Sequence, residues 1–116
     1  MFRDTIPEMS VAPGTDPKII EEILAIANPN DLETVSEIWK AVVRSDVTEL
    51  AASVQCPATV INGEYDRTCT PEQGAEMAAK LSQDLVLMPG IGHLPMHEAP
   101  GALASLLDIH LQKSDA

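Results

Sequence analysis

Hydrophobic residues recur at helical spacing in the first third of the chain. Asp16 offers an N-cap, and Pro17 suits the first turn of a helix. The apolar residues that follow share one face: Ile19, Ile20, Ile23, Leu24 and Ala27. This spacing predicts a short amphipathic helix, which the segment Asn28-Pro29-Asn30 is expected to end.

A second amphipathic helix is expected directly afterwards. Asn30 and Glu33 have the spacing of a capping box. The apolar positions then repeat at helical intervals: Leu32, Val35, Ile38, Trp39, Val42 and Val43. Ordinary packing of this stripe against the rest of the protein is the favoured interpretation, and a role for Trp39 in lining a substrate pocket is the alternative.

The pattern changes near residue 58. Two continuous apolar runs, residues 58–62 and 85–88, are typical of strands buried on both faces of a parallel sheet. Between them, the segment Thr70-Pro71-Glu72-Gln73 is a strong helix start. The residues on one face of that helix are Met77, Ala78 and Leu81. A strand, a helix and a strand over this length predict a right-handed crossover between parallel strands.

The other segments complete an α/β arrangement. Residues 1–15 lack periodicity and contain two prolines, so loop or extended chain is expected there. Asp46 with Glu49 predicts a short helix through about residue 53. A last helix is expected to begin at Pro100 and to fray from Lys113. Its apolar face would hold Leu103, Leu106, Leu107, His110 and Leu111.

Composition narrows the classes of partner. The chain has 116 residues, 45% of them hydrophobic and 22% charged, which is ordinary for one small globular domain. Seven basic residues against 18 acidic ones give a net charge of -11, which disfavours binding to nucleic acid or to anionic membranes. The N-terminus has neither a basic lead nor an apolar leader segment, so a cytoplasmic protein is expected.

The two cysteines are expected to be reduced. Cys56 and Cys69 lie on opposite sides of the first expected strand. A strand of that length separates its ends by roughly 15 Å. A disulfide requires Cα atoms within about 7 Å of each other.

Candidate chemistry follows the two expected strands. Asp66 comes shortly after the first strand and His93 shortly after the second. Because reacting groups gather at the carboxyl ends of parallel strands, the two loops should lie side by side. A carboxylate in that place can accept a hydrogen bond from the imidazole Nδ1 and leave the other nitrogen to act as general base and acid. Gly90 and Gly92 would let the histidine loop adopt unusual dihedral angles.

These segments resemble a known family. The sequences CPATVINGEYD (residues 56–66) and MPGIGHLPMHEAP (residues 88–100) are similar to the acid loop and the histidine loop of the α/β-hydrolase fold superfamily. The resemblance covers residues 46–111 and implies that Asp66 is the acid of a catalytic triad and His93 its base. It also implies a C-terminal core part (46–116) carrying the last two strands of a larger sheet, preceded by the end of a helical cap (1–45).

The nucleophile of such a triad is missing from the sequence. No serine lies in the G-x-S-x-G pattern of a nucleophile elbow, and no aspartate or cysteine takes its place. The resemblance therefore implies a hydrolase of a small-molecule ester, lactone or related bond that needs no metal and no organic cofactor. We expect it to be active only when an upstream half supplies the nucleophile and the oxyanion hole. Whether Met1 is the true start is left open.

Three further residues near the candidate pair could carry chemistry of their own: His97, Cys69 and Glu98. His97 has helical metal-ligand spacing from His93, but Pro95 interrupts it, so a metal site is not expected. Cys69 is expected to be a buried or half-buried thiol rather than a nucleophile, and Glu98 to cap the last helix. The alternative function is a non-catalytic interaction module, the product of a truncated or split gene, which associates with itself or with another chain through an exposed strand edge.

Overall fold

The computed structural model describes residues 2–27 and 31–114. Along the chain the elements are α1 (Phe2–Thr5), the π-helix η1 (Ile6–Ser10), α2 (Pro17–Ala27), α3 (Leu32–Arg44), α4 (Thr48–Ala51), β1 (Val60–Gly63), α5 (Pro71–Lys80), β2 (Leu85–Met88), α6 (Pro95–Glu98) and α7 (Pro100–Ser114). None of the helices in these ranges is long and apolar enough to cross a bilayer.

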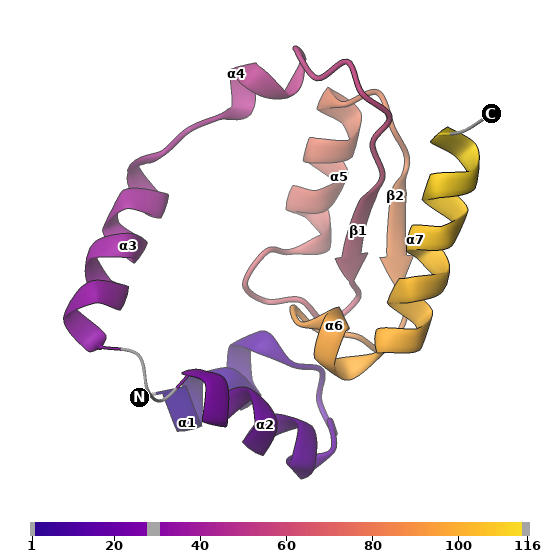
Figure 1. Cartoon of the computed structure of the whole chain (residues 1–116). Coiled ribbons are helices and arrows are strands. Elements are labelled where there is room, and N and C mark those ends of the chain that lie inside the picture. Colours follow the sequence, from indigo (N-terminus) through magenta and orange to yellow (C-terminus); the bar gives the residue numbers. More distant parts are fainter. Residues whose placement is uncertain (1, 28–30, 115–116) are drawn as a thin grey trace.

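Two parallel strands form the sheet, as the sequence predicts. The register of β1 and β2 runs from Val60 opposite Leu85 to Gly63 opposite Met88. Figure 1 shows α5 and α7 on either side of the strand pair, with both strand ends pointing toward α6. The expectation of an α/β arrangement of two parallel strands with flanking helices is therefore confirmed.

The first strand begins later than expected. It was predicted over residues 58–62, whereas β1 covers Val60–Gly63. Residues 83 and 84 would lie opposite residues 58 and 59, but Gln83 N donates instead to Ala78 O at 2.8 Å, at the end of α5. Ser82 adopts a positive φ of 55° in the turn that ends α5, and β2 begins only after this turn, at Leu85.

The crossover helix α5 starts where the sequence predicts. The Thr70 side chain accepts a hydrogen bond from the backbone of Gln73, and the Gln73 side chain accepts one from the backbone of Thr70, which makes a complete capping box. Ala78 on this helix is buried against the sheet side, while Met77 is 37% exposed. The short helix expected after Asp46 is also present as α4, where the Asp46 carboxylate accepts a hydrogen bond from Thr48 N at 2.9 Å.

The expectation of loop or extended chain over residues 1–15 is wrong for residues 2–10, which form α1 and η1. Ile6 and Val11 are buried in one cluster with Ile23 and Leu24 of α2. Burial of these side chains outweighs the breaking tendency of Pro7, which sits in the first turn of η1, where a missing N–H costs little. Partly buried residues that pack on this cluster include Leu94, next to His93.

The helix α2 begins as predicted, because the Asp16 carboxylate accepts a hydrogen bond from Lys18 N at 2.9 Å. The expected helix end at residues 28–30 lies outside the described residues. The N-cap of α3 is Asp31, one residue later than expected, and its side chain accepts from Thr34 N at 2.9 Å.

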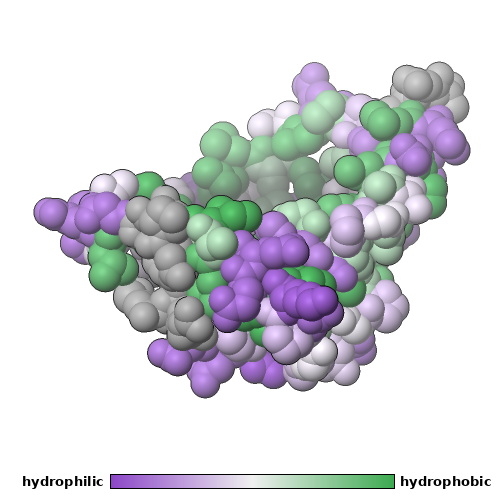
Figure 2. Space-filling view, turned by 60° about the horizontal axis from the view of Figure 1, so that its bottom comes forward, coloured by the Kyte–Doolittle hydropathy of each residue, from purple (hydrophilic) through white to green (hydrophobic). Residues whose placement is uncertain are grey.

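The apolar stripe of α3 is not packed, which makes the packing interpretation wrong. Trp39 is 60% exposed and Ile38 58% exposed. Figure 1 shows α3 standing apart from the strands and joined to them through α4. Figure 2 shows hydrophobic residues gathered around a hollow in the middle of the molecule. The helix is therefore amphipathic without a partner among the described residues.

The last helix, α7, begins at Pro100 as expected and continues through Ser114. Leu103 and Leu106 are half-buried, but Leu107 is 50% exposed and Leu111 is 60% exposed. A hydrogen bond of 2.9 Å between His110 Nδ1 and Thr59 Oγ1 ties the helix to the residues before β1.

Candidate functional site

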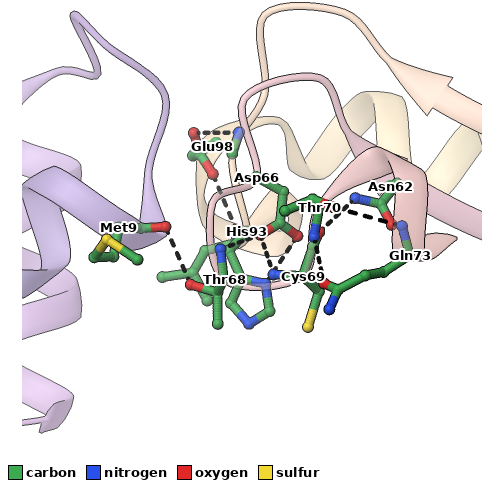
Figure 3. Close-up of polar contacts among 11 residues, drawn as sticks. Met9, Asn62, Asp66, Thr68, Cys69, Thr70, Gln73, His93 and Glu98 are labelled. Atoms are coloured by element: carbon green, nitrogen blue, oxygen red, sulfur yellow. Dashed lines mark hydrogen bonds and ion pairs between the residues drawn. The ribbon is translucent and has the colours of Figure 1, made fainter.

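Asp66 and His93 meet beyond the carboxyl ends of the two strands. His93 Nδ1 lies 2.9 Å from Asp66 Oδ2. The aspartate side chain is buried, with 7% of its surface exposed, whereas that of the histidine is 33% exposed. The predicted juxtaposition of the two loops is thus confirmed, and the pair has a buried carboxylate and an imidazole that solvent reaches (Figure 3).

The Asp66 carboxylate is fixed by backbone donors. Its Oδ1 accepts hydrogen bonds from Thr68 N at 2.9 Å and from Cys69 N at 2.8 Å. Because Oδ1 is held by two N–H groups, Oδ2 is left to face the imidazole. The acid loop itself supplies these donors through its turn between β1 and α5. The orientation of the carboxylate is therefore fixed by its own loop.

The acid loop and the histidine loop are joined by their backbones. Glu64 N donates to Met88 O at 3.0 Å, and Tyr65 N donates to Ile91 O at 2.8 Å. The Glu64 carboxylate also accepts from Gly90 N at 2.8 Å. The two backbone bonds continue the pairing of the strands past their ends and keep the two loops in register.

Two glycines of the loops are needed for different reasons. Gly90 has a φ of +71°, which favours glycine, as expected for a tight loop. Gly92 instead allows close approach: a Cβ there would lie 2.7 Å from Val11 Cα and from Ala12 N. The histidine loop is therefore pressed against the N-terminal segment, a contact that local sequence patterns did not reveal.

Glu98 does not have the role that the sequence predicts for it. It was expected to cap the last helix, but its carboxylate accepts hydrogen bonds from Gly92 N at 2.9 Å and from Leu94 N at 3.1 Å. It also accepts from Ala12 N at 2.7 Å. These partners are the neighbours of His93 and the N-terminal segment, so the cap expectation is wrong. The pairing with residue 12 is long-range and has no local signal.

The second imidazole nitrogen is available for chemistry. Within the described residues no group hydrogen-bonds to His93 Nε2. Two shallow pockets, of about 180 and 280 Å³, are lined by other residues, and neither includes Asp66 or His93 in its lining. The pair is therefore reached by solvent from the side of the imidazole, whose side chain is 33% exposed.

Cys69 lies beside the pair but is not half-buried as expected; both cysteines are exposed and unpaired. Its backbone N–H donates to the Asp66 carboxylate. Neighbouring protein atoms still displace some water from the exposed thiol, and this desolvation together with the negative charge of Asp66 raises the pKa of Cys69. A thiol with a raised pKa carries less thiolate at neutral pH and is a poorer nucleophile. The interpretation that Cys69 is not the nucleophile is consistent with this chemistry.

Neutralising Asp66 should lower the pKa of Cys69. In Asp66→Asn the repulsion between carboxylate and thiolate is gone, so the thiolate forms at lower pH. We expect alkylation of Cys69 by iodoacetamide, followed in a Cys56→Ser background, to shift its pH profile to lower pH. His93→Asn keeps the Asp66 charge and serves as the control. An identical profile with and without the Asp66 charge would contradict this coupling.

No group of three or more His, Cys, Asp or Glu side chains that could hold a metal occurs in residues 2–27 and 31–114. His97 lies on α6, which begins only at Pro95, so it does not share a helix with His93.

A scan of the chain against protein-family models and a search of curated proteins found no match.

Proposed function

We propose that this chain supplies the acid and the histidine of a catalytic triad of the α/β-hydrolase type. The observation that carries the proposal is the 2.9 Å contact between Asp66 Oδ2 and His93 Nδ1, with the other carboxylate oxygen held by two backbone N–H groups. Its support from the sequence is the order and spacing of the acid and histidine loops after two parallel strands.

The proposed chemistry follows from the donor and acceptor roles. An ionised carboxylate only accepts, so a neutral His93 keeps its proton on Nδ1 and has a lone pair on Nε2. Nε2 takes the proton of a nucleophile as it attacks an ester, lactone or similar carbonyl, and then gives that proton to the leaving group. Asp66 holds the tautomer and stabilises the imidazolium. This acid–base chemistry uses no metal and no organic cofactor.

The nucleophile must come from a second polypeptide segment in this proposal. The described sheet has two strands, so the outer edge of β1 is free to accept another strand. A segment that pairs there would lie near the carboxyl ends of the strands, where Asp66 and His93 are found. It would also supply the oxyanion-hole donors and cover the open surface around the imidazole.

The first test is the turnover of p-nitrophenyl esters by the chain alone. We expect no difference between the wild type and His93→Ala, because an imidazole without a nucleophile and an oxyanion hole lacks most of the transition-state stabilisation. Turnover by the lone chain that falls in His93→Ala would contradict the claim that the site is incomplete. Sequencing the DNA that precedes the Met1 codon is the companion observation, because a G-x-S-x-G elbow there would identify the missing half.

A second candidate function is an interaction module without catalysis, and α3 favours it. The helix has 13 residues, a length that is marginal in water without tertiary support. Its apolar stripe is exposed, including Trp39 at 60% and Val42 at 54%. A stripe of this kind is typical of a helix that docks on another surface.

The α3 stripe should make the chain associate with itself when no other partner is present. We expect sedimentation velocity to show a sedimentation coefficient that rises with concentration, and Ile38→Glu to abolish the rise because it places a charge in the stripe. Ala41→Glu adds the same charge to an exposed position on the opposite face and should leave association unchanged. Equal association of all three proteins would show that α3 is not the contact.

A further inference from the structure

We propose that Glu98 is the positioning residue for His93. Its carboxylate holds the backbone on both sides of the histidine, and so aims Nδ1 at Asp66. The inference rests on the proposed function for its catalytic meaning, but the geometry it concerns can be measured without any activity. Figure 3 shows Glu98 at the upper left of the site, with Cys69 and Thr70 to its right.

The hydrogen bonds of Glu98 bracket the histidine. Oε1 accepts from Gly92 N at 2.9 Å, and Oε2 accepts from Leu94 N at 3.1 Å. Gly92 and Leu94 are the residues directly before and after His93. The Leu94 N–H belongs to the peptide group directly after the His93 Cα, and the Gly92 N–H belongs to the peptide group that precedes Gly92, so one carboxylate restrains the loop on both sides of the histidine.

The backbone N–H of His93, which lies between those of Gly92 and Leu94, also has a hydrogen-bond partner. His93 N donates to Ser10 O at 3.0 Å. Three consecutive N–H groups of the loop thus have partners, and the central one is held by the N-terminal segment. Glu98 joins that segment to the same point, because Oε1 also accepts from Ala12 N at 2.7 Å and lies 3.5 Å from Thr15 Oγ1.

The short helix α6 explains how Glu98 reaches back. The helix begins at Pro95, and both His97 N and Glu98 N donate to Leu94 O, at 2.9 and 3.0 Å. This single turn reverses the direction of the chain. The Glu98 carboxylate therefore lies next to the backbone N–H groups of Gly92 and Leu94. No ion pair of Glu98 with a lysine or arginine is found in the described parts of the chain, so its negative charge is directed at backbone donors.

Charge-assisted hydrogen bonds of this type are stronger than neutral ones, and the loss of one changes a local equilibrium by about tenfold or more. Without Glu98, the backbone around His93 should sample other orientations. The imidazole would then leave Asp66 for part of the time, and both tautomers would become populated.

The experiment is NMR of the full chain labelled with ¹⁵N, reading the imidazole nitrogens of His93. The wild type should show one tautomer, with a slowly exchanging proton on Nδ1. In Glu98→Ala we expect a mixture of tautomers and exchange of that proton with water that is about tenfold faster or more. Glu98→Gln keeps one acceptor oxygen but loses the charge and the bond to Leu94, so its exchange rate should lie between the two.

The matched control is Glu64→Ala. Glu64 also accepts from a backbone N–H of the histidine loop, that of Gly90 at 2.8 Å, but it does not touch the neighbours of His93. Its removal should leave the imidazole signals as in the wild type. Circular dichroism checks that each variant is folded, and if Glu98→Ala is not, Glu98→Gln decides alone.

Two results would overturn the inference, and they differ in meaning. The positioning role is contradicted if both Glu98 variants give wild-type imidazole signals, or if Glu64→Ala changes those signals as much as Glu98→Ala does. Either result would leave the Asp66–His93 pair intact. A wild-type imidazole that does not respond to Asp66→Asn would instead overturn the pair itself, and with it the proposed function.

Discussion

In the proposed hydrolase, completed by a nucleophile-bearing half, replacing Asp66 with asparagine is expected to lower turnover by about 10⁴-fold. The asparagine oxygen can still accept from Thr68 N and Cys69 N, so the acid loop should keep its shape. Its amide nitrogen then faces His93 Nδ1 as a donor and favours the tautomer with the proton on Nε2. In that tautomer the nitrogen nearest the nucleophile has no lone pair to act as a base.

The measurement is kcat for a p-nitrophenyl ester with the chain joined to its nucleophile-bearing half. Thermal unfolding of both proteins accompanies it, since a similar Tm separates lost chemistry from lost structure. Glu64→Gln, which changes another carboxylate of the same loop, is the matched control and should retain nearly full turnover. A modest loss in Asp66→Asn, comparable with that of the control, would mean that Asp66 does not orient the histidine.

Gly63→Ala is expected to give the largest loss of stability among single substitutions near the site. A Cβ at Gly63 would overlap the carbonyl oxygens of Gly92 and Ile91, and it would lie 2.8 Å from Ile91 C. These atoms belong to backbone, which cannot rotate away as the end of a side chain can. Overpacking of this kind costs about 1–3 kcal/mol. The corresponding fall in Tm is roughly 10 °C for a small domain.

Gly101→Ala provides the matched control, because no atom lies within 4 Å of the Cβ it would add. Position 101 is in α7, where alanine has the higher helix propensity, so its Tm should be unchanged or raised. Thermal unfolding followed by circular dichroism compares the two variants. Equal Tm values would show that the acid and histidine loops are less closely packed than described.

The parts of the fold that could be predicted from the sequence are those set by local signals. The capping box at Thr70 and Gln73 and the N-cap of α2 at Asp16 act within one helical turn, and both were predicted correctly. The two strands were recognised from continuous apolar runs. Their parallel pairing brought Asp66 and His93 together as expected, because a parallel sheet aligns the loops that follow its strands.

The errors come from contacts between distant parts of the chain. Residues 2–10 are helical because Ile6 and Val11 are buried with residues of α2, which no pattern within the segment indicates. Glu98 binds Ala12 across most of the sequence, so its role could not be read from its place before Pro100. The α3 stripe has the spacing of a packed helix, yet spacing shows only which residues share a face and not whether a partner covers that face.

The comparison of wild type with His93→Ala after completion of the site tests the central claim most directly. The chain is joined to the nucleophile-bearing segment and turnover of a p-nitrophenyl ester is measured. We predict that turnover appears on joining and falls by about 10⁴-fold or more in His93→Ala, because this variant lacks the proposed base for the nucleophile. Turnover that appears on joining but is unchanged in His93→Ala would contradict the account.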